Sequence, residues 1–157
     1  MMDLTQPIDA PIGAEAIAEE RPLVVLAEDN DDCRHVYGLI LRHFGYDVAE
    51  VSSGEEAIKA TRLLQPKLVL MDIGLPGIDG WEAGAVLKAD PETSAVPLVA
   101  FSARICSTTD LVGKTEAFDG FILKPVSPKT LVDRVDAYLR LVGVQRPSPR
   151  IPKVANK

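Results

Sequence analysis

The stretch LVVLAEDN, residues 23–30, is the strongest indication of the fold. Its first five residues are an unbroken apolar run of strand length, which is typical of a strand buried on both faces of a sheet. Residues 29–32 follow directly and offer side-chain oxygens that can cap a helix. Apolar side chains then recur at helical spacing, at Val36, Leu39, Ile40 and Phe44. The stretch therefore predicts a strand, a polar loop and a helix in succession.

The same unit of strand and helix recurs along the chain. Further strands are expected at residues 46–51, 67–71, 96–101 and 120–123. Further helices are expected after the serines at positions 52 and 53, over residues 81–89 and 108–117, and along the apolar stripe from Thr130 to Val142. This alternation predicts an α/β fold with a doubly wound, five-stranded parallel sheet. Ligands of such sheets bind beyond the carboxyl ends of the strands.

Length and charge indicate one domain with two short tails. A chain of 157 residues fits one globular domain, which we place at residues 22–142. Residues 1–21 form an acidic tail of net charge −4 and residues 143–157 a basic, proline-containing tail of net charge +4; both are expected to be flexible. The remaining charge of −6 disfavours nucleic acid as a partner, because phosphate backbones require a basic face. No DNA-binding or catalytic module is expected after residue 142.

The sequence contains no sign of a membrane span or a secretory signal. Its longest apolar runs are far below the roughly 18 residues that a membrane span needs. The first twenty residues lack a basic start and an unbroken apolar stretch, which argues against a secretory signal. Two cysteines, Cys33 and Cys106, do not indicate a disulfide framework. We expect a cytoplasmic protein.

Acidic residues follow two of the expected strands. Glu28 and Asp29 come after the first strand and Asp72 ends the third, so their carboxylates should meet at one edge of the sheet. Such a cluster repels itself and needs a compensating positive charge. Because the ligands are hard oxygens, without His or Cys, the cation that they favour is Mg²⁺, which often shares its ligand shell with a phosphate.

Two more polar residues are expected at the same edge. Lys124 follows the fifth strand and can be a fixed counter-charge for the acids or a partner of a phosphoryl oxygen. Ser102 follows the fourth strand and offers a hydroxyl group. The expected site thus combines acids, an amine and a hydroxyl from four different strands.

The order and spacing of these residues resemble the receiver domain of two-component response regulators. The resemblance rests on four motifs, which are Glu28-Asp29, MDIGLPGIDG at residues 71–80, AFSA at residues 100–103, and Lys124-Pro125. It covers roughly residues 22–142. It implies a flavodoxin-like, CheY-like fold with the strand order 2-1-3-4-5.

The resemblance also implies which residues bind metal and phosphate. Asp72 would be the phosphoacceptor. Asp29, Asp72 and the backbone carbonyl of Gly74 would bind Mg²⁺, and Glu28 would act mostly through a metal-bound water. Lys124 would hold an oxygen of the phosphoryl group.

A switch pair is implied as well. Ser102 would hold another phosphoryl oxygen and move toward it, and Phe121 would then turn inward into the vacated space. A Phe121 ring that packs statically on the last helix is the alternative, and the sequence does not decide between the two.

By this resemblance the chain would act in a phosphorelay rather than as an enzyme, apart from self-catalysed phosphotransfer and autodephosphorylation. The phosphoryl donor would be a phosphohistidine of a sensor histidine kinase or a histidine phosphotransfer protein. The output would be contact with an unidentified protein target, and a homodimer is compatible with this. An alternative is a receiver-like scaffold that docks independently of phosphate. A phosphohydrolase is disfavoured, because Gly74 stands where a second acid would act on the leaving group.

Overall fold

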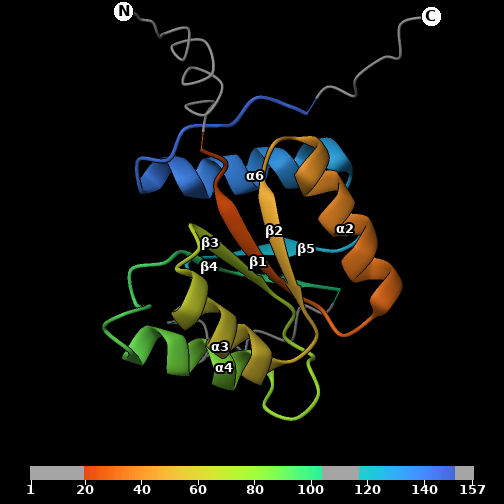
Figure 1. The fold of residues 1–157 in the computed structure, drawn as a ribbon. Coiled ribbons are helices and arrows are strands. Elements are labelled where there is room, and N and C mark those ends of the chain that lie inside the picture. Colours follow the sequence, from red (N-terminus) through yellow and green to blue (C-terminus); the bar gives the residue numbers. More distant parts are fainter. Residues whose placement is uncertain (1–19, 104–116, 151–157) are drawn as a thin grey trace, which may run out of the picture.

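A computed structural model describes residues 20–103 and 117–150 of the chain, and its centre is one parallel sheet (Figure 1). The strands are β1 (Leu23–Ala27), β2 (Asp47–Val51), β3 (Leu68–Met71), β4 (Leu98–Ser102) and β5 (Gly120–Leu123). All four neighbouring pairs are parallel, and the order across the sheet is β2-β1-β3-β4-β5. The expected sheet and its strand order are therefore confirmed. Apart from residue 117, the helix expected over 108–117 lies outside the described residues.

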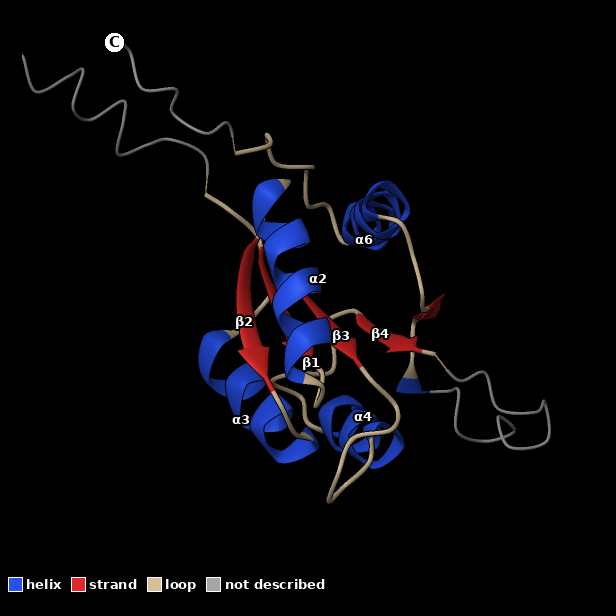
Figure 2. Ribbon diagram, turned by 90° about the vertical axis from the view of Figure 1, so that its right-hand side faces the viewer, coloured by secondary structure: helices blue, strands red, loops and turns tan. Residues whose placement is uncertain are grey.

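Four helices in the described part of the chain cover the two faces of the sheet (Figure 2). They are α2 (Asp31–His43), α3 (Gly54–Leu64), α4 (Gly80–Ala89) and α6 (Pro128–Leu141). Helices α2 and α6 lie on one face and α3 and α4 on the other. Within the described ranges, no helix is long and apolar enough to span a bilayer.

Each of these helices begins at a polar cap. The side chains of Asn30, Ser53, Asp79 and Ser127 each accept a hydrogen bond from the backbone N–H three residues further on. These bonds satisfy donors that have no partner inside the helix. The caps of α2, α3 and α6 follow their strands after a few residues, whereas the loop between β3 and α4 is longer and contains Asp72 and Gly74.

Three strands begin later than expected, β3 by one residue at Leu68, and hydrogen bonding explains the late starts of the other two, β2 and β4. The N–H of Tyr46 donates to the carbonyl of Leu41 at 3.1 Å, so Tyr46 still belongs to the turn that ends α2, and β2 starts at Asp47. Pro97 has no N–H to donate, and only its carbonyl joins the sheet, by accepting from Val69 at 2.9 Å. Strand β4 therefore begins at Leu98 and extends to Ser102.

The core consists of two apolar layers, one on each face of the sheet. Along β1, Val24 and Leu26 belong to the layer under α2 and α6, whereas Val25 and Ala27 belong to the layer under α3 and α4. All four are fully buried. Burial on both faces explains why β1 is a continuous apolar run instead of an alternating one.

Residues 143–150, which we call the C-terminal strap, contact the domain. Val144 packs against the core layer under α2 and α6, and Pro147 is buried. The guanidinium of Arg146 lies 2.7 Å from Asp133 of α6, and that of Arg150 lies 2.6 Å from Asp47 at the start of β2. In Figure 1 the strap is the blue segment that crosses the molecule beyond α6. It lies at the amino ends of the strands, away from the expected site.

Candidate functional site

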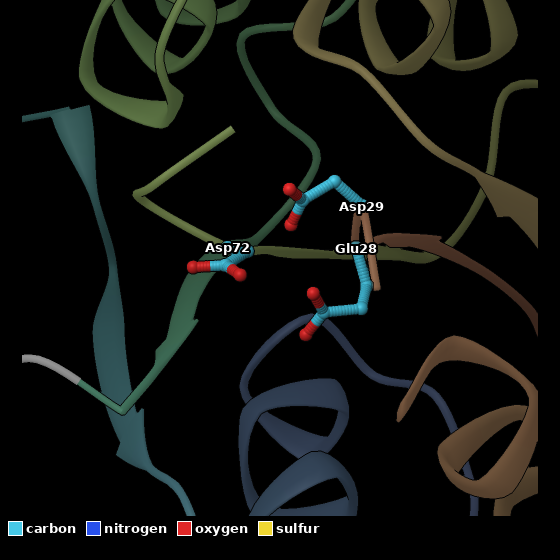
Figure 3. Close-up of side chains that lie close together, drawn as sticks. All are labelled: Glu28, Asp29 and Asp72. Atoms are coloured by element: carbon cyan, nitrogen blue, oxygen red, sulfur yellow. The ribbon is translucent and has the colours of Figure 1, made fainter. Parts of the chain in front are cut away.

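Three carboxylates meet at the carboxyl ends of β1 and β3 (Figure 3). The two strands are neighbours in which Ala27 pairs with Met71, so the residues that follow, Glu28 and Asp72, leave the sheet side by side. One oxygen each of Glu28, Asp29 and Asp72 lies within 4.8 Å of the others. The structure thus brings together the three acids that the sequence places after these strands.

Backbone groups hold two of these acids in place. The N–H of Asp72 donates to the carbonyl of Ala27 at 2.9 Å, and the N–H of Glu28 donates to Val51 at 3.0 Å. The side chains are held too, because the carboxylate of Asp72 accepts from Gly74 N–H at 3.1 Å and that of Glu28 accepts from Asn30 N–H at 3.1 Å. Neither carboxylate can turn away without losing a hydrogen bond.

Lys124 lies between two of the carboxylates. Its Nζ donates a hydrogen bond to Oε1 of Glu28 and lies 3.6 Å from Oδ2 of Asp72. The ammonium also lies 5.1 Å from the centre of the Phe101 ring, a geometry in which the ring face attracts a cation. The lysine side chain is only 10% exposed. The structure thus shows Lys124 in contact with the acids, as expected of a counter-charge. Its contact with a phosphoryl oxygen stays a prediction.

Burial and charge shift the pKa values of this pair. Burial raises the pKa of Glu28 above its usual value, although the hydrogen bonds from Lys124 and Asn30 act in the opposite direction. Burial alone would lower the pKa of Lys124, but the hydrogen bond to Glu28 and the charge of Asp72 outweigh it, so the pKa of Lys124 is raised. Lys124 is therefore a cation at neutral pH.

The donors of this cluster fit a hard divalent cation. One ammonium faces three acids, so ionised carboxylates leave negative charge that is not neutralised. The three side chains offer only oxygen, which suits Mg²⁺ better than metals that prefer imidazole or thiolate. Gly74 is exposed, and among the described residues other than its chain neighbours the only atom within 4 Å of a Cβ placed there is Asp72 Oδ1, at 3.9 Å. The loop thus leaves space beside Asp72.

Ser102 and Phe121 lie on the same face of the sheet. Ser102 is the last residue of β4 and is buried; it pairs in register with Leu123, next to Lys124. Ser102 lies two residues after Ala100, which belongs to the layer under α3 and α4, and residues two apart in a strand share a face. Ser102 therefore lies on that face. Phe121 pairs with Ala100, is 36% exposed, and lies 6.4 Å from Trp81 and 6.0 Å from Phe118 between ring centres. Whether Phe121 moves inward stays a prediction.

One contact of the site escaped the sequence analysis. The side chain of Arg34, in the second turn of α2, donates to the backbone carbonyl of Glu28 at 2.8 Å. A single arginine on a helix belongs to no motif that indicates chemistry. The only sequence signal was a basic residue close to a helix start, where acidic residues are favoured.

Comparisons with known proteins agree with this geometry. A sequence model of the response regulator receiver domain matches residues 24–136. The DNA-binding response regulator MtrA of Mycolicibacterium smegmatis is 36% identical over 120 residues, which cover 76% of this chain and 51% of MtrA. Protein PilH of Pseudomonas aeruginosa is 28% identical over 116 residues, which cover 74% of this chain and 96% of PilH. The chain thus spans about half the length of MtrA.

A solved structure shares the fold. The receiver domain of sensor histidine kinase PA1611 from Pseudomonas aeruginosa superimposes with a TM-score of 0.71 and 25% identity, over 77% of this chain and 99% of that domain. That structure has a magnesium ion coordinated in its active-site cleft.

Proposed function

The chain belongs to the family of response regulator receiver domains of two-component systems, and from this premise we propose that Asp72 is its phosphoacceptor. The observation that carries the proposal is the position of Asp72 beside two further carboxylates and the ammonium of Lys124. Lys124 neutralises part of the negative charge around a carboxylate that the backbone holds at a strand end, and the charge that remains favours a bound cation.

Phosphotransfer would proceed as an in-line displacement. An oxygen of Asp72 attacks the phosphorus of a phosphohistidine; the new P–O bond forms as the P–N bond breaks, and the imidazole leaves with the electron pair and takes up a proton. A carboxylate is a weak nucleophile, so the rate depends on its placement and on neutralising the phosphoryl oxygens. Lys124 and the hydroxyl of Ser102 would hold two of these oxygens.

The proposal includes a bound Mg²⁺. Asp29, Asp72 and the carbonyl of Gly74 would hold it, with Glu28 acting through a water molecule. When bound, the ion would neutralise charge on the phosphoryl oxygens and on the acids. The support is the set of oxygen donors and their surplus negative charge.

Donor and output are also part of the proposal. The donor would be a sensor histidine kinase or a histidine phosphotransfer protein in the cytoplasm, and the phosphorylated state would be passed on by protein contact, with Ser102 and Phe121 as the switch. MtrA binds DNA, but about half of its length lies outside the match. We therefore propose a protein, not nucleic acid, as the partner of the domain described here.

The test is phosphorylation by a small donor. Acetyl phosphate with Mg²⁺ should add a phosphoryl group to the protein, seen in the intact mass, and Asp72→Asn should abolish it. Asp79→Asn is the matched control, because Asp79 caps α4 on the loop that follows Asp72, and an asparagine caps equally well. This variant should be phosphorylated like the wild type.

Two results would contradict the proposal. Absence of any phosphoryl increment in the wild type would remove the phosphoacceptor. Phosphorylation of Asp72 that leaves partner binding unchanged would favour the scaffold, which docks independently of phosphate.

A further inference from the structure

The guanidinium of Arg34 connects three parts of the chain next to the acidic cluster. One terminal nitrogen donates to the carbonyl of Glu28 at 2.8 Å, and the other donates to the carboxylate of Asp31 at 2.6 Å. Its Nε lies 3.8 Å from Glu50 of β2. The side chain is 19% exposed. Arg34 thus joins the β1–α2 loop, the first turn of α2 and strand β2.

The bond to Glu28 acts on one particular peptide group. The carbonyl of Glu28 belongs to the peptide that links Glu28 to Asp29. Rotation of this peptide plane would change the directions of both side chains, because it lies between their Cα atoms. A hydrogen bond from a charged donor resists that rotation more strongly than a neutral one.

The positive charge of Arg34 is unfavourable in two respects. A cation near the amino end of a helix opposes the helix dipole, and a cation near the acids competes with a metal for their negative charge. Charge alone therefore predicts that removing Arg34 tightens metal binding. If Arg34 instead positions the acids, its removal should weaken metal binding.

We propose that Arg34 is a positioning residue, which holds the Glu28–Asp29 peptide so that both carboxylates face Asp72 and thereby raises the affinity of the site for Mg²⁺. The inference rests on the proposed function, because it assigns a metal to this cluster. Residues that orient metal ligands in this way typically change affinity by about 10- to 100-fold.

The helix provides a matched control. Arg42 lies two turns further along α2 and pairs with the same Glu50, at 2.6 Å, but its side chain bonds to Val48 instead of Glu28. Arg34→Gln and Arg42→Gln each remove one positive charge and one ion pair with Glu50. Only the first removes the bond to the Glu28 carbonyl, and it also removes the exposed ion pair with Asp31.

The experiment measures two quantities on the full chain. Isothermal titration of MgCl2, at a temperature where circular dichroism shows each variant folded, gives the affinity. Hydrogen exchange of the Asp29 and Asn30 amides, without Mg²⁺, reports the order of the loop. For Arg34→Gln we expect affinity about 10-fold weaker and faster exchange. Arg34→Lys should resemble it, because a lysine lacks the planar fork that reaches both oxygens.

The outcomes separate the two ideas. Arg42→Gln should bind Mg²⁺ with the affinity of the wild type, and its Asp29 and Asn30 amides should exchange at the rate of the wild type. Equal or tighter binding by Arg34→Gln, or equal weakening in both glutamine variants, would overturn the positioning effect while the metal site stands. A wild type that binds no Mg²⁺ would overturn the metal site itself, and the inference with it.

Discussion

Lys124 governs the electrostatics of the site at the scale of single residues. Its ammonium contacts Glu28 and lies 3.6 Å from Asp72, so it partly neutralises the acids without a metal. A bound cation would neutralise the same two carboxylates. If Mg²⁺ binds as proposed, Lys124 and the ion would therefore compete for one set of negative charges, even though both would hold a phosphoryl group.

This competition leads to a prediction for Lys124→Gln. The variant leaves Glu28, which is 3% exposed, without its charged partner, and loss of a partner in a buried pair costs about 3 kcal/mol. Without Mg²⁺ the free energy of unfolding should therefore fall by about that amount. The same change should strengthen Mg²⁺ binding, so Mg²⁺ should stabilise the variant more than the wild type. Urea denaturation with and without MgCl2 measures both effects.

Lys88→Gln is the control for this prediction. Lys88 is also partly buried and ion-paired, with Asp119 at 2.8 Å, but it bonds to the carbonyls of Ser94 and Val96 away from the acids. Lys88→Gln should be less stable than the wild type, but Mg²⁺ should stabilise it by the same amount as the wild type. If Mg²⁺ stabilises Lys124→Gln and the wild type equally, the lysine and the metal do not compete.

At the scale of elements, the first residue of α4 is packed against the end of β3. A Cβ on Gly80 would contact the carbonyl oxygen of Asp72 and lie 2.7 Å from the Cα of Ile73. These are backbone atoms and cannot turn aside as a side chain can. The absence of a side chain at Gly80 therefore lets α4 approach the strand end that bears Asp72.

Gly80→Ala should therefore destabilise the fold, although alanine favours helices by about 1 kcal/mol. Forced overpacking usually costs about 1–3 kcal/mol, so we expect a net loss of roughly 1 kcal/mol in thermal or urea unfolding. Phosphorylation of Asp72 should also be slower, because the clash displaces its backbone. Gly74→Ala serves as the stability control, since an added Cβ there stays 3.9 Å from its nearest neighbour. Equal stability of the two variants would contradict this account.

The elements and the acids could be predicted because their signals are local. Apolar runs and caps follow one another in the sequence, and parallel strands place their carboxyl ends at one edge. Strand starts were predicted less accurately, because Tyr46 is a residue type that favours strands, yet its N–H donates back to the carbonyl of Leu41. The contact of Arg34 with Glu28 could not be predicted, since it depends on the path of a side chain and not on a pattern of residue types.

At the scale of the whole molecule, the C-terminal strap closes the end of the domain opposite the acids. The N–H of Arg150 donates to the carbonyl of His43 at 2.8 Å, and its side chain meets Asp47. The two residues of the ion pair are 103 positions apart, so no local signal indicates it. The family model ends at residue 136, and the strap lies beyond it.

The strap has opposing effects on stability. Val144 and Pro147 gain from burial, which favours docking. Within the described residues, however, the hydroxyl of Tyr46 and one oxygen of Asp136 are buried without a hydrogen-bond partner, and burial raises the pKa of Tyr46 to about 12. Without the strap, water could reach the buried polar groups and form hydrogen bonds with them. This would offset part of the stability that is lost with the apolar contacts of Val144 and Pro147.

We expect apolar burial to outweigh these effects. A chain that ends at Val142 should lose about 2 kcal/mol of unfolding free energy, because exposed ion pairs such as that of Arg150 contribute only about 0–1 kcal/mol. Arg150→Gln should accordingly have a small effect, and so should high salt. A chain that ends at Arg150 keeps the strap and is the control. If high salt or Arg150→Gln lowered the unfolding free energy as much as truncation at Val142, ion pairs would hold the strap. If the chain that ends at Val142 were as stable as the control, Val144 and Pro147 would contribute nothing to stability.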